Sequence, residues 1–299
     1  MTEKEIIKAD FKAYFNQELK PFESVTAFFD NEKEYFNYLK KSLYFTKSVI
    51  KPLENKGMTI SDSIVDVASG DGQMSFALAL LGYKNITLFD LDQERLDKGV
   101  SLIGLFCNET KAKRISDTAT NLNITFDVLI SYQTIEHLSD EGNYSIAKKH
   151  CQIEFLQNID KHITKLCFFN APNRSFPIDG HDTGKPFFHF LPMGVKKYLI
   201  NHDIVKCSWA GICRPVSIRF LNKYLPSFEL KSNYYTYDNM KEYLANRPSF
   251  DYMGNRIYSI DVNKLSKKKA IINTVANTLG KNAQKILPVL SVIYKKKTK

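Results

Sequence analysis

The stretch Ile64-Val-Asp-Val-Ala-Ser-Gly-Asp-Gly-Gln-Met-Ser75, followed by Ile86-Thr-Leu-Phe-Asp-Leu-Asp92, decides the fold. Residues 64–67 predict a short apolar strand, residues 74–81 an apolar helix, and residues 86–89 a second strand. Gly70 and Gly72 lack the Cβ atom that would keep a ligand away from the main chain. The segment therefore predicts a strand, turn, helix and strand unit that holds a cofactor containing a nucleoside.

Charge and spacing at this unit leave two cofactors open. The N-terminal N–H groups of the expected helix favour a carboxylate or a phosphate, and Asp90 at the end of the second strand can accept two hydrogen bonds from a ribose diol. Ser75 lies three residues after the second glycine, where a dinucleotide fingerprint needs a small residue. The glycines alone therefore do not exclude NAD.

Asp66, Ala68, Gly70 and Gly72 follow one another at two-residue intervals. This pattern resembles motif I of the class I S-adenosylmethionine (SAM) methyltransferases, although the family usually has Gly where this chain has Ala68. The resemblance implies that the acid and the glycines surround the methionine end of SAM, and that Asp90 is the ribose-binding acid.

A second stretch, residues 126–140, looks like the fourth strand of these methyltransferases and the Glu-His element that follows it. Residues 114–120 fit the third strand and its turn, where Asp117 is expected to hold the adenine amino group. Residues 165–173 fit a fifth strand that ends at a proline. The resemblance implies these cofactor-binding residues: Asp66, Ala68, Ser69, Gly70, Gly72, Asp90, Leu91, Asp117, Thr118 and Ser131.

The expected fold class is therefore α/β, with a Rossmann-like, mostly parallel sheet flanked by helices and an antiparallel last strand. The expected organisation has an N-terminal helical cap at residues 1–58, a catalytic domain at 59–262 and a basic amphipathic helical tail at 263–299. Residues 256–262 look like the closing antiparallel strand.

Length and composition, 299 residues with 43% hydrophobic content, suit one main domain. The beginning of the chain shows neither a secretory signal nor a transmembrane segment, so we expect a cytoplasmic protein. Five cysteines without a C-x-x-C pair argue against a disulfide framework and against a zinc knuckle.

The net charge of +10 lies in the tail, because residues 262–299 carry ten lysines and no acid. Apolar residues recur at helical spacing in residues 271–279 and again around Pro288. An apolar face with lysines suits an anionic membrane surface, where each lysine adds about 1 kcal/mol of attraction. The alternative is a terminal helix packed on the body. Nucleic acid is not expected, because the tail interleaves its lysines with aliphatic residues and has no Arg and only one aromatic residue, Tyr294, that could stack on bases.

Residues 170–192 contain four prolines and two glycines, which exclude an ordinary helix. In the expected fold this segment follows the fifth strand, at the sheet edge where the cofactor lies. It is therefore the expected acceptor-binding loop. His181, Asp182 and His189 are candidates for general base or orienting group; the substrate-binding candidates are Arg174 for an anionic group, Asn173 and Tyr132. Residues 219–237 are rich in aromatic residues, which suits either a sugar- or lipid-facing wall or ordinary strand faces.

Methyl transfer to a hydroxyl requires in-line alignment and removal of a proton. Glu136 and His137 are the first catalytic candidates, and their structural alternative is a pair that begins a helix. Some quinone O-methyltransferases have Glu-x-x-Glu-His here and bind magnesium, but this chain has Gln133 in place of the first carboxylate. We therefore expect no metal ion and a proton acceptor at His137 or His181.

The expected function is a SAM-dependent methyltransferase that O-methylates a sugar or a lipid-linked glycan at the inner face of a membrane. This acceptor class follows from a similarity to methyltransferases of bacterial surface-polysaccharide pathways. A quinone or another small hydroxylated metabolite is the second acceptor class. A SAM- or nucleotide-binding adaptor without catalysis is the alternative from a different class of function.

Overall fold

The computed structural model describes residues 2–141, 146–179, 181–207, 212–233, 278 and 288–298. The described strands form one sheet in the order β3-β2-β1-β4-β5-β7-β6. Their bounds are β1 Ser63–Val67, β2 Asn85–Asp90, β3 Lys111–Ser116, β4 Phe126–Tyr132, β5 Ile163–Pro172, β6 Phe228–Asn233 and β7 Val289–Lys296. The α-helices are α1 Glu3–Phe15, α2 Glu32–Phe45, α3 Lys51–Glu54, α4 Gln73–Leu80, α5 Gln93–Phe106, α6 Lys149–His162, α7 Met193–Asn201 and α8 Ile218–Tyr224.

The described chain divides into two compact units. Unit 1 contains residues 2–118 and 126–129. Unit 2 contains residues 119–125 and the described residues from 130 onward.

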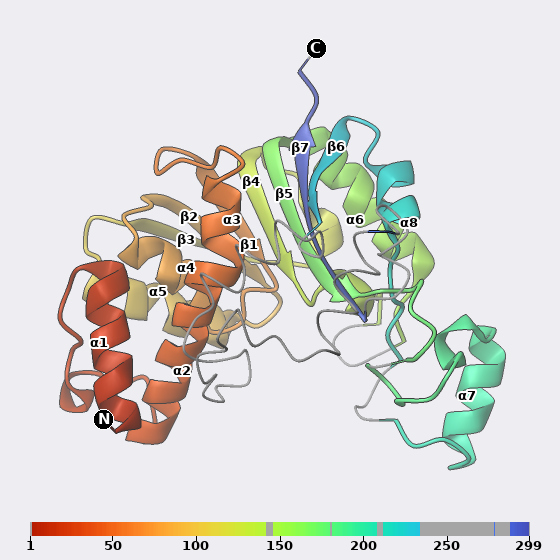
Figure 1. Cartoon of the computed structure of the whole chain (residues 1–299), viewed down its shortest axis with the longest axis horizontal. Helices are drawn as coiled ribbons and strands as arrows, with labels where there is room; N and C mark the ends of the chain where they lie inside the picture. The colour runs from red at the N-terminus through yellow and green to blue at the C-terminus, as the bar shows by residue number, and fades with distance from the viewer. Residues whose placement is uncertain are drawn as a thin grey trace. The chain divides into compact units, whose positions relative to one another are not determined.

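The N-terminal helices of unit 1 begin where the sequence supplies caps. Thr2 and Glu5 form a reciprocal capping box at the start of α1, and Asn31 accepts the Glu34 N–H at the start of α2. Helices α1 and α2 are in contact (Figure 1), and α2 also packs on α4. The Tyr38 hydroxyl of α2 donates to the Asp71 carbonyl over 3.0 Å, so this helix supports the glycine turn directly.

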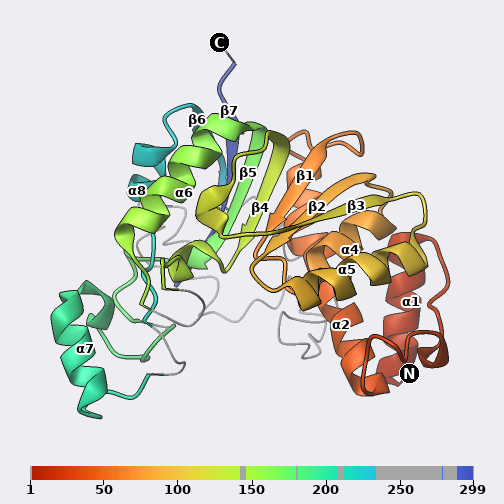
Figure 2. The same cartoon turned by 180° about the vertical axis from the view of Figure 1, so that it is seen from behind.

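The strands of unit 1 confirm the parallel part of the expected sheet. β1 pairs with β2 in parallel, with Asp66 opposite Leu88, and β2 pairs with β3 in parallel. Helix α5 packs against β2 and β3 (Figure 2). Because parallel strands end at the same edge, the carboxyl ends of β1, β2 and β3 bring their polar residues together.

Unit 2 contains the antiparallel part of the sheet. β7 runs antiparallel to β5, with Phe169 opposite Val292, and antiparallel to β6 on its other side. Leu290, Val292, Ile293 and Tyr294 are each 1% exposed or less, as expected for a strand that is covered on both faces. The expected antiparallel strand near the end of the sheet is therefore confirmed, but a different segment forms it.

The expected helical tail is wrong for residues 289–296, which are strand β7 and not an amphipathic helix. A short apolar run of this kind does not distinguish helix from strand by periodicity, and its β-branched residues favour the strand. Thr278 is helical. The rest of the tail and the expected strand at 256–262 lie outside the described residues, as does the part of the aromatic stretch beyond residue 233.

The first part of that aromatic stretch also differs from the prediction of strand faces. Residues 219–224 belong to helix α8, which Ser217 caps by accepting the Phe220 N–H over 3.2 Å. Helix α8 packs on α6 (Figure 2).

Among the described residues, no helix has the length and apolar character needed to cross a membrane.

Candidate functional site

The glycine turn after β1 has a left-handed backbone at three positions. Ala68, Gly70 and Gly72 have φ values of 57°, 54° and 75°, in the left-handed region that favours glycine. The Ala68 and Ser69 N–H groups both donate to the Phe89 carbonyl, at 2.7 and 3.2 Å. A Cβ atom on Gly72 would lie 2.8 Å from Leu88 Cδ2, so the turn also needs a glycine for close packing.

Asp90 at the end of β2 is held by two main-chain donors. Its Oδ2 accepts the Gly70 N–H over 2.8 Å, and its Oδ1 accepts the Asp92 N–H over 3.1 Å. Each carboxylate oxygen can accept a further hydrogen bond. The side chain is thereby oriented and can still receive a hydroxyl pair.

Three further side chains lie near the ends of these strands. Asp66 is buried and accepts the Ser75 hydroxyl over 2.8 Å, so it binds the start of α4; burial raises its pKa to about 7. The Asp117 N–H donates to the Asp90 carbonyl over 3.1 Å, which joins the ends of β2 and β3. The Ser69 Oγ is buried and has no hydrogen-bond partner among the described residues.

These features fit a nucleoside cofactor in unit 1. The turn has a left-handed backbone at its two glycines, Asp90 has accepting capacity left, and Ser69 has an unused buried hydroxyl. Leu91, directly after Asp90, is 42% exposed, as expected for an apolar residue that a bound ring would cover. Thr118 follows Asp117 and donates its N–H to that carboxylate over 2.7 Å.

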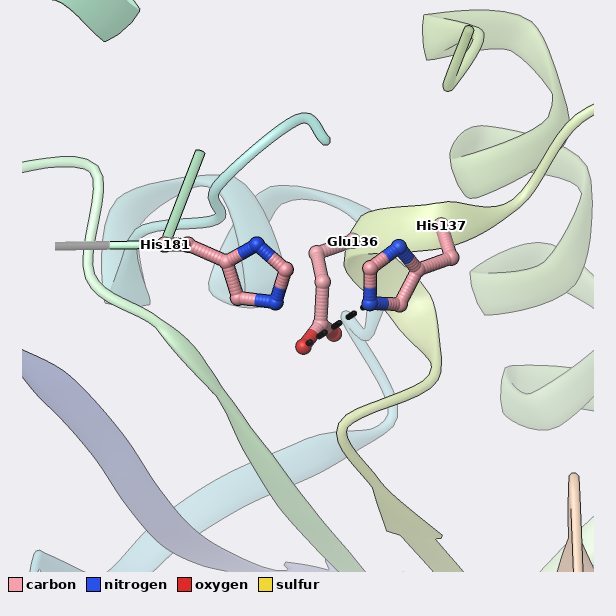
Figure 3. Close-up of side chains that lie close together, drawn as sticks. All are labelled: Glu136, His137 and His181. Atoms are coloured by element: carbon pink, nitrogen blue, oxygen red, sulfur yellow. Dashed lines mark ion pairs between the residues drawn. The ribbon is translucent and has the colours of Figure 1, made fainter. Parts of the chain in front are cut away.

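Unit 2 holds a separate cluster made of Glu136, His137 and His181 (Figure 3). Glu136 and His137 belong to the 3₁₀ turn Ile135–His137 after β4, whereas His181 comes from the loop after β5. The Glu136 carboxylate lies between the two imidazole rings, and His137 Nε2 is 3.9 Å from Glu136 Oε1. The two ring centroids are 5.0 Å apart.

Burial determines the charge states in this cluster. Glu136 is fully buried, and this raises its pKa to about 8. Burial, with a smaller effect of His181, lowers the pKa of His137 to about 4. His181 is different, because its hydrogen bond to Asp182 raises its pKa. The Asp182 carboxylate lies 3.1 Å from His181 Nδ1 and accepts the Cys213 N–H over 3.0 Å.

A cavity of about 160 Å³ in unit 2 includes His181 in its wall. Most of its wall comes from the expected acceptor loop, and the lining residues are Gln133, Pro172, Asn173, Ile178, Asp179, His181, His189, Pro215, Pro288 and Val289. His189 is buried and shares a hydrogen bond of 3.0 Å with the Arg174 carbonyl, which makes His189 Nε2 the donor. Burial lowers the pKa of His189.

The structure brings most of the predicted catalytic residues together. Glu136, His137, His181 and Asp182 form one cluster, and His189 lies elsewhere on the wall of the cavity that His181 also lines. Asn173 lines this cavity, whereas Arg174 and Tyr132 are not among its described lining residues. Ser131 is fully buried, and its Oγ has no hydrogen-bond partner in the described parts of the chain.

Among the residues of this region that sequence reasoning missed are Asp179, Pro215 and Cys213. Asp179 lines the cavity and accepts the Thr183 hydroxyl over 2.9 Å, and it lies within the predicted loop. Pro215 lines the cavity and Cys213 holds Asp182 in place, and both come from a segment with no recognisable motif. Only the first of the three had a signal in the sequence.

Strand order and the turn together define the class of fold. The order β3-β2-β1-β4-β5-β7-β6, with β7 antiparallel beside β5 and a glycine turn after β1, is the class I methyltransferase fold. This confirms the fold class expected from the sequence. The roles of individual side chains stay predictions.

Comparison with known proteins adds structural neighbours at low identity. No protein-family model matches this chain, and no curated protein sequence matches it. Magnesium protoporphyrin IX methyltransferase (ChlM) from Synechocystis PCC 6803 with bound SAH has a TM-score of 0.49 and 8% identity, over 97% of this chain and 93% of that one. The CcbJ methyltransferase from Streptomyces caelestis has a TM-score of 0.48 and 9% identity, over 87% and 95% of the two chains.

An S-adenosylmethionine-dependent methyltransferase from Mesorhizobium loti is similar at a TM-score of 0.47 and 11% identity, over 82% of this chain and 96% of that one. Identities of this size do not transfer residue roles. The assignment of the fold therefore rests on the strand order and on the turn.

Proposed function

We propose that this protein is a SAM-dependent methyltransferase that O-methylates a small hydroxylated acceptor of the sugar type. The observation that carries the proposal is the turn after β1, where Ala68, Gly70 and Gly72 are left-handed and the Gly70 N–H holds Asp90. This geometry places a glycine turn next to an oriented carboxylate. A nucleoside cofactor with a ribose diol suits both features.

Unit 1 supplies the groups that we assign to SAM. Asp90 accepts the ribose hydroxyls, Asp117 accepts the adenine amino group, and the N-terminus of α4 lies at the turn, where it favours the carboxylate of the methionine part. SAM, when bound, supplies an electrophilic methyl group on sulfur. The NAD alternative requires a pyrophosphate on the same turn and is tested with the same variants.

We assign the acceptor to the cavity of unit 2. Its wall combines polar groups of Gln133, Asn173 and Asp179 with proline and aliphatic surface, which suits a compact molecule with several hydroxyls. His181 is the member of the Glu136 cluster that also lines this cavity. We therefore place the reacting hydroxyl at His181.

Calorimetric titration with SAM tests the cofactor assignment. We expect wild-type protein to bind SAM, and Asp90→Ala to weaken binding about 10- to 100-fold, because hydrogen bonds to a charged group contribute about 1.5–3 kcal/mol. Glu94→Gln, an exposed change in the first turn of α5, is the control and should bind as wild type does. Binding of NAD but not of SAM would contradict the proposal.

Release of S-adenosylhomocysteine with candidate acceptors tests the reaction. We expect turnover with nucleotide sugars or lipid-linked sugars, and loss of turnover in His181→Ala with SAM affinity kept. Turnover with quinols alone would select the second acceptor class. SAM binding without turnover on any hydroxylated acceptor would favour the adaptor. The expected attachment to an anionic membrane rests on tail residues outside the described parts and stays a prediction.

A further inference from the structure

Three side chains in unit 2 bring atoms that can bind a metal ion close together. The carboxylate of Glu136 and one ring nitrogen each of His137 and His181 lie within 4.8 Å of one another. Figure 3 shows a nitrogen of each ring turned toward the Glu136 carboxylate. Ligand atoms about 2 Å from one ion lie no more than about 4 Å apart, so small side-chain rotations are enough to bring all three atoms onto one ion.

The burial of Glu136 is a further, independent indication that this cluster binds a ligand. Its side chain is 0% exposed, and neither carboxylate oxygen has a hydrogen-bond partner among the described residues. A buried carboxyl group that lacks partners is costly unless it is paired or coordinates a metal. The nearest cationic candidate is His137 Nε2 at 3.9 Å, which is beyond hydrogen-bond distance.

Asp182 orients the His181 ring through the ring nitrogen Nδ1. His181 Nδ1 lies 3.1 Å from Asp182 Oδ1, and the buried Asp182 is itself held by the Cys213 N–H. Nδ1 is engaged by Asp182, and the other ring nitrogen of His181, Nε2, is the one turned toward the Glu136 carboxylate (Figure 3). A carboxylate behind a histidine in this way is the arrangement that fixes the tautomer of metal-binding histidines.

From this geometry we infer that Glu136, His137 and His181 bind a divalent transition-metal ion. Two imidazoles and one carboxylate suit Zn²⁺, Fe²⁺, Co²⁺ or Ni²⁺, whereas Mg²⁺ prefers oxygen ligands. In the sequence, Glu136 and His137 stand beside Gln133, and these three residues alone would make a poor magnesium site. His181, from a distant loop, adds a second imidazole and makes the group of possible ligands rich in nitrogen.

Three protein ligands leave positions open on the ion for water or for an acceptor oxygen. His181 also lines the cavity, so an ion held by the three residues would lie beside a wall of the acceptor site. Such an ion would act as a Lewis acid on a coordinated acceptor hydroxyl, whose proton would pass to solvent as the O–CH₃ bond forms and the S–CH₃ bond of SAM breaks. His181 would then be a ligand and not the proton acceptor. This consequence rests on the proposed function; metal binding by the three residues does not.

Titration of the metal-free full chain with Co²⁺ tests the inference without SAM or acceptor. We expect about one equivalent of Co²⁺ to bind with visible d–d absorption, and Zn²⁺ to abolish the absorption. His181→Ala should lose it, and Asp182→Asn should weaken binding about 10- to 100-fold. His150→Ala is the matched control, because His150 belongs to another group of possible ligands, with Asp140 and Cys151, and should leave the absorption unchanged.

Folding of each variant is checked by circular dichroism and thermal unfolding. Glu136→Gln keeps the shape of the side chain and replaces the buried carboxyl group by an amide, so it should weaken Co²⁺ binding at least tenfold without lowering the melting temperature of the metal-free protein. No stoichiometric Co²⁺ binding by the wild type, equal binding by His181→Ala, or loss of binding in His150→Ala would each overturn the inference. None of these results affects the SAM titration, so the two proposals fail separately.

Discussion

Asp66 is the residue of the glycine-turn region whose protonation matters most for stability. It is 3% exposed, and its hydrogen bonding with Ser75 only partly offsets the cost of burying a charge. Burial raises its pKa from 3.8 to about 7. The folded protein therefore holds a proton that the unfolded chain releases above pH 4.

This difference predicts a pH dependence with a definite sign. A group whose pKa is raised by folding stabilises the fold fully below its unfolded pKa, and that contribution is lost as pH rises through the folded value. Between pH 5 and 8 the wild type should lose about 2–3 kcal/mol of unfolding free energy relative to Asp66→Asn. Urea unfolding of both proteins without SAM measures this difference; parallel curves against pH would show that Asp66 is ionised in the fold.

Helix α5 contains two glycines, Gly99 and Gly104, that differ in how closely their surroundings pack against them. A Cβ on Gly99 would lie 2.8 Å from Leu88 Cδ2 and 3.1 Å from the Asp71 carbonyl, so this helix approaches the glycine turn closely. A Cβ on Gly104, one and a half turns further along, would meet nothing within 4 Å. The first glycine is required by the turn, whereas the second only weakens the helix.

Matched alanine substitutions test this contrast. Gly104→Ala should stabilise the protein by about 0.5–1 kcal/mol through helix propensity alone. Gly99→Ala should destabilise it by about 1–3 kcal/mol, because the new methyl group displaces Leu88 and the turn. Denaturant unfolding gives both values. A stabilising Gly99→Ala would show that α5 lies further from the turn than the structure places it.

Strand β7 connects the end of the chain to the sheet as a whole. It lies between β5 and β6, so its removal leaves both neighbours with unpaired edges and uncovers buried aliphatic side chains. Tyr294 in this strand also donates to Asn222 over 2.7 Å. We expect a chain that stops at residue 287 to lose cooperative unfolding and to aggregate.

A chain that stops at Lys297 is the control for this truncation. It keeps β7 and the hydrogen bond from the Lys297 N–H to the Ser227 carbonyl, so it should unfold as the full chain does. Thermal scans of the two truncated chains distinguish a strand of the sheet from a dispensable tail. Cooperative unfolding of the shorter chain would contradict the position of β7.

Local sequence was sufficient for the glycine-turn region of unit 1. The strand, turn, helix and strand around Gly70 and Gly72, each within one residue of the predicted bounds, and the position of Asp90 at the end of a strand all follow from residues close together in the chain. Glycine spacing sets the backbone, and an apolar run followed by an acid sets the end of a parallel strand. Such features depend on neighbours a few residues away.

Only the tertiary structure decided which distant segments meet. The sequence predicts a helix for residues 289–296, but the periodicity of a short apolar run does not distinguish a helix from a strand. Pairing with β5 and β6 makes these residues a strand. The sequence predicts His181 as a candidate proton acceptor, but no residue near it in the chain indicates that it lies close to Glu136 and His137. Sheet pairing and loop closure join residues far apart in sequence, and no local pattern records that choice.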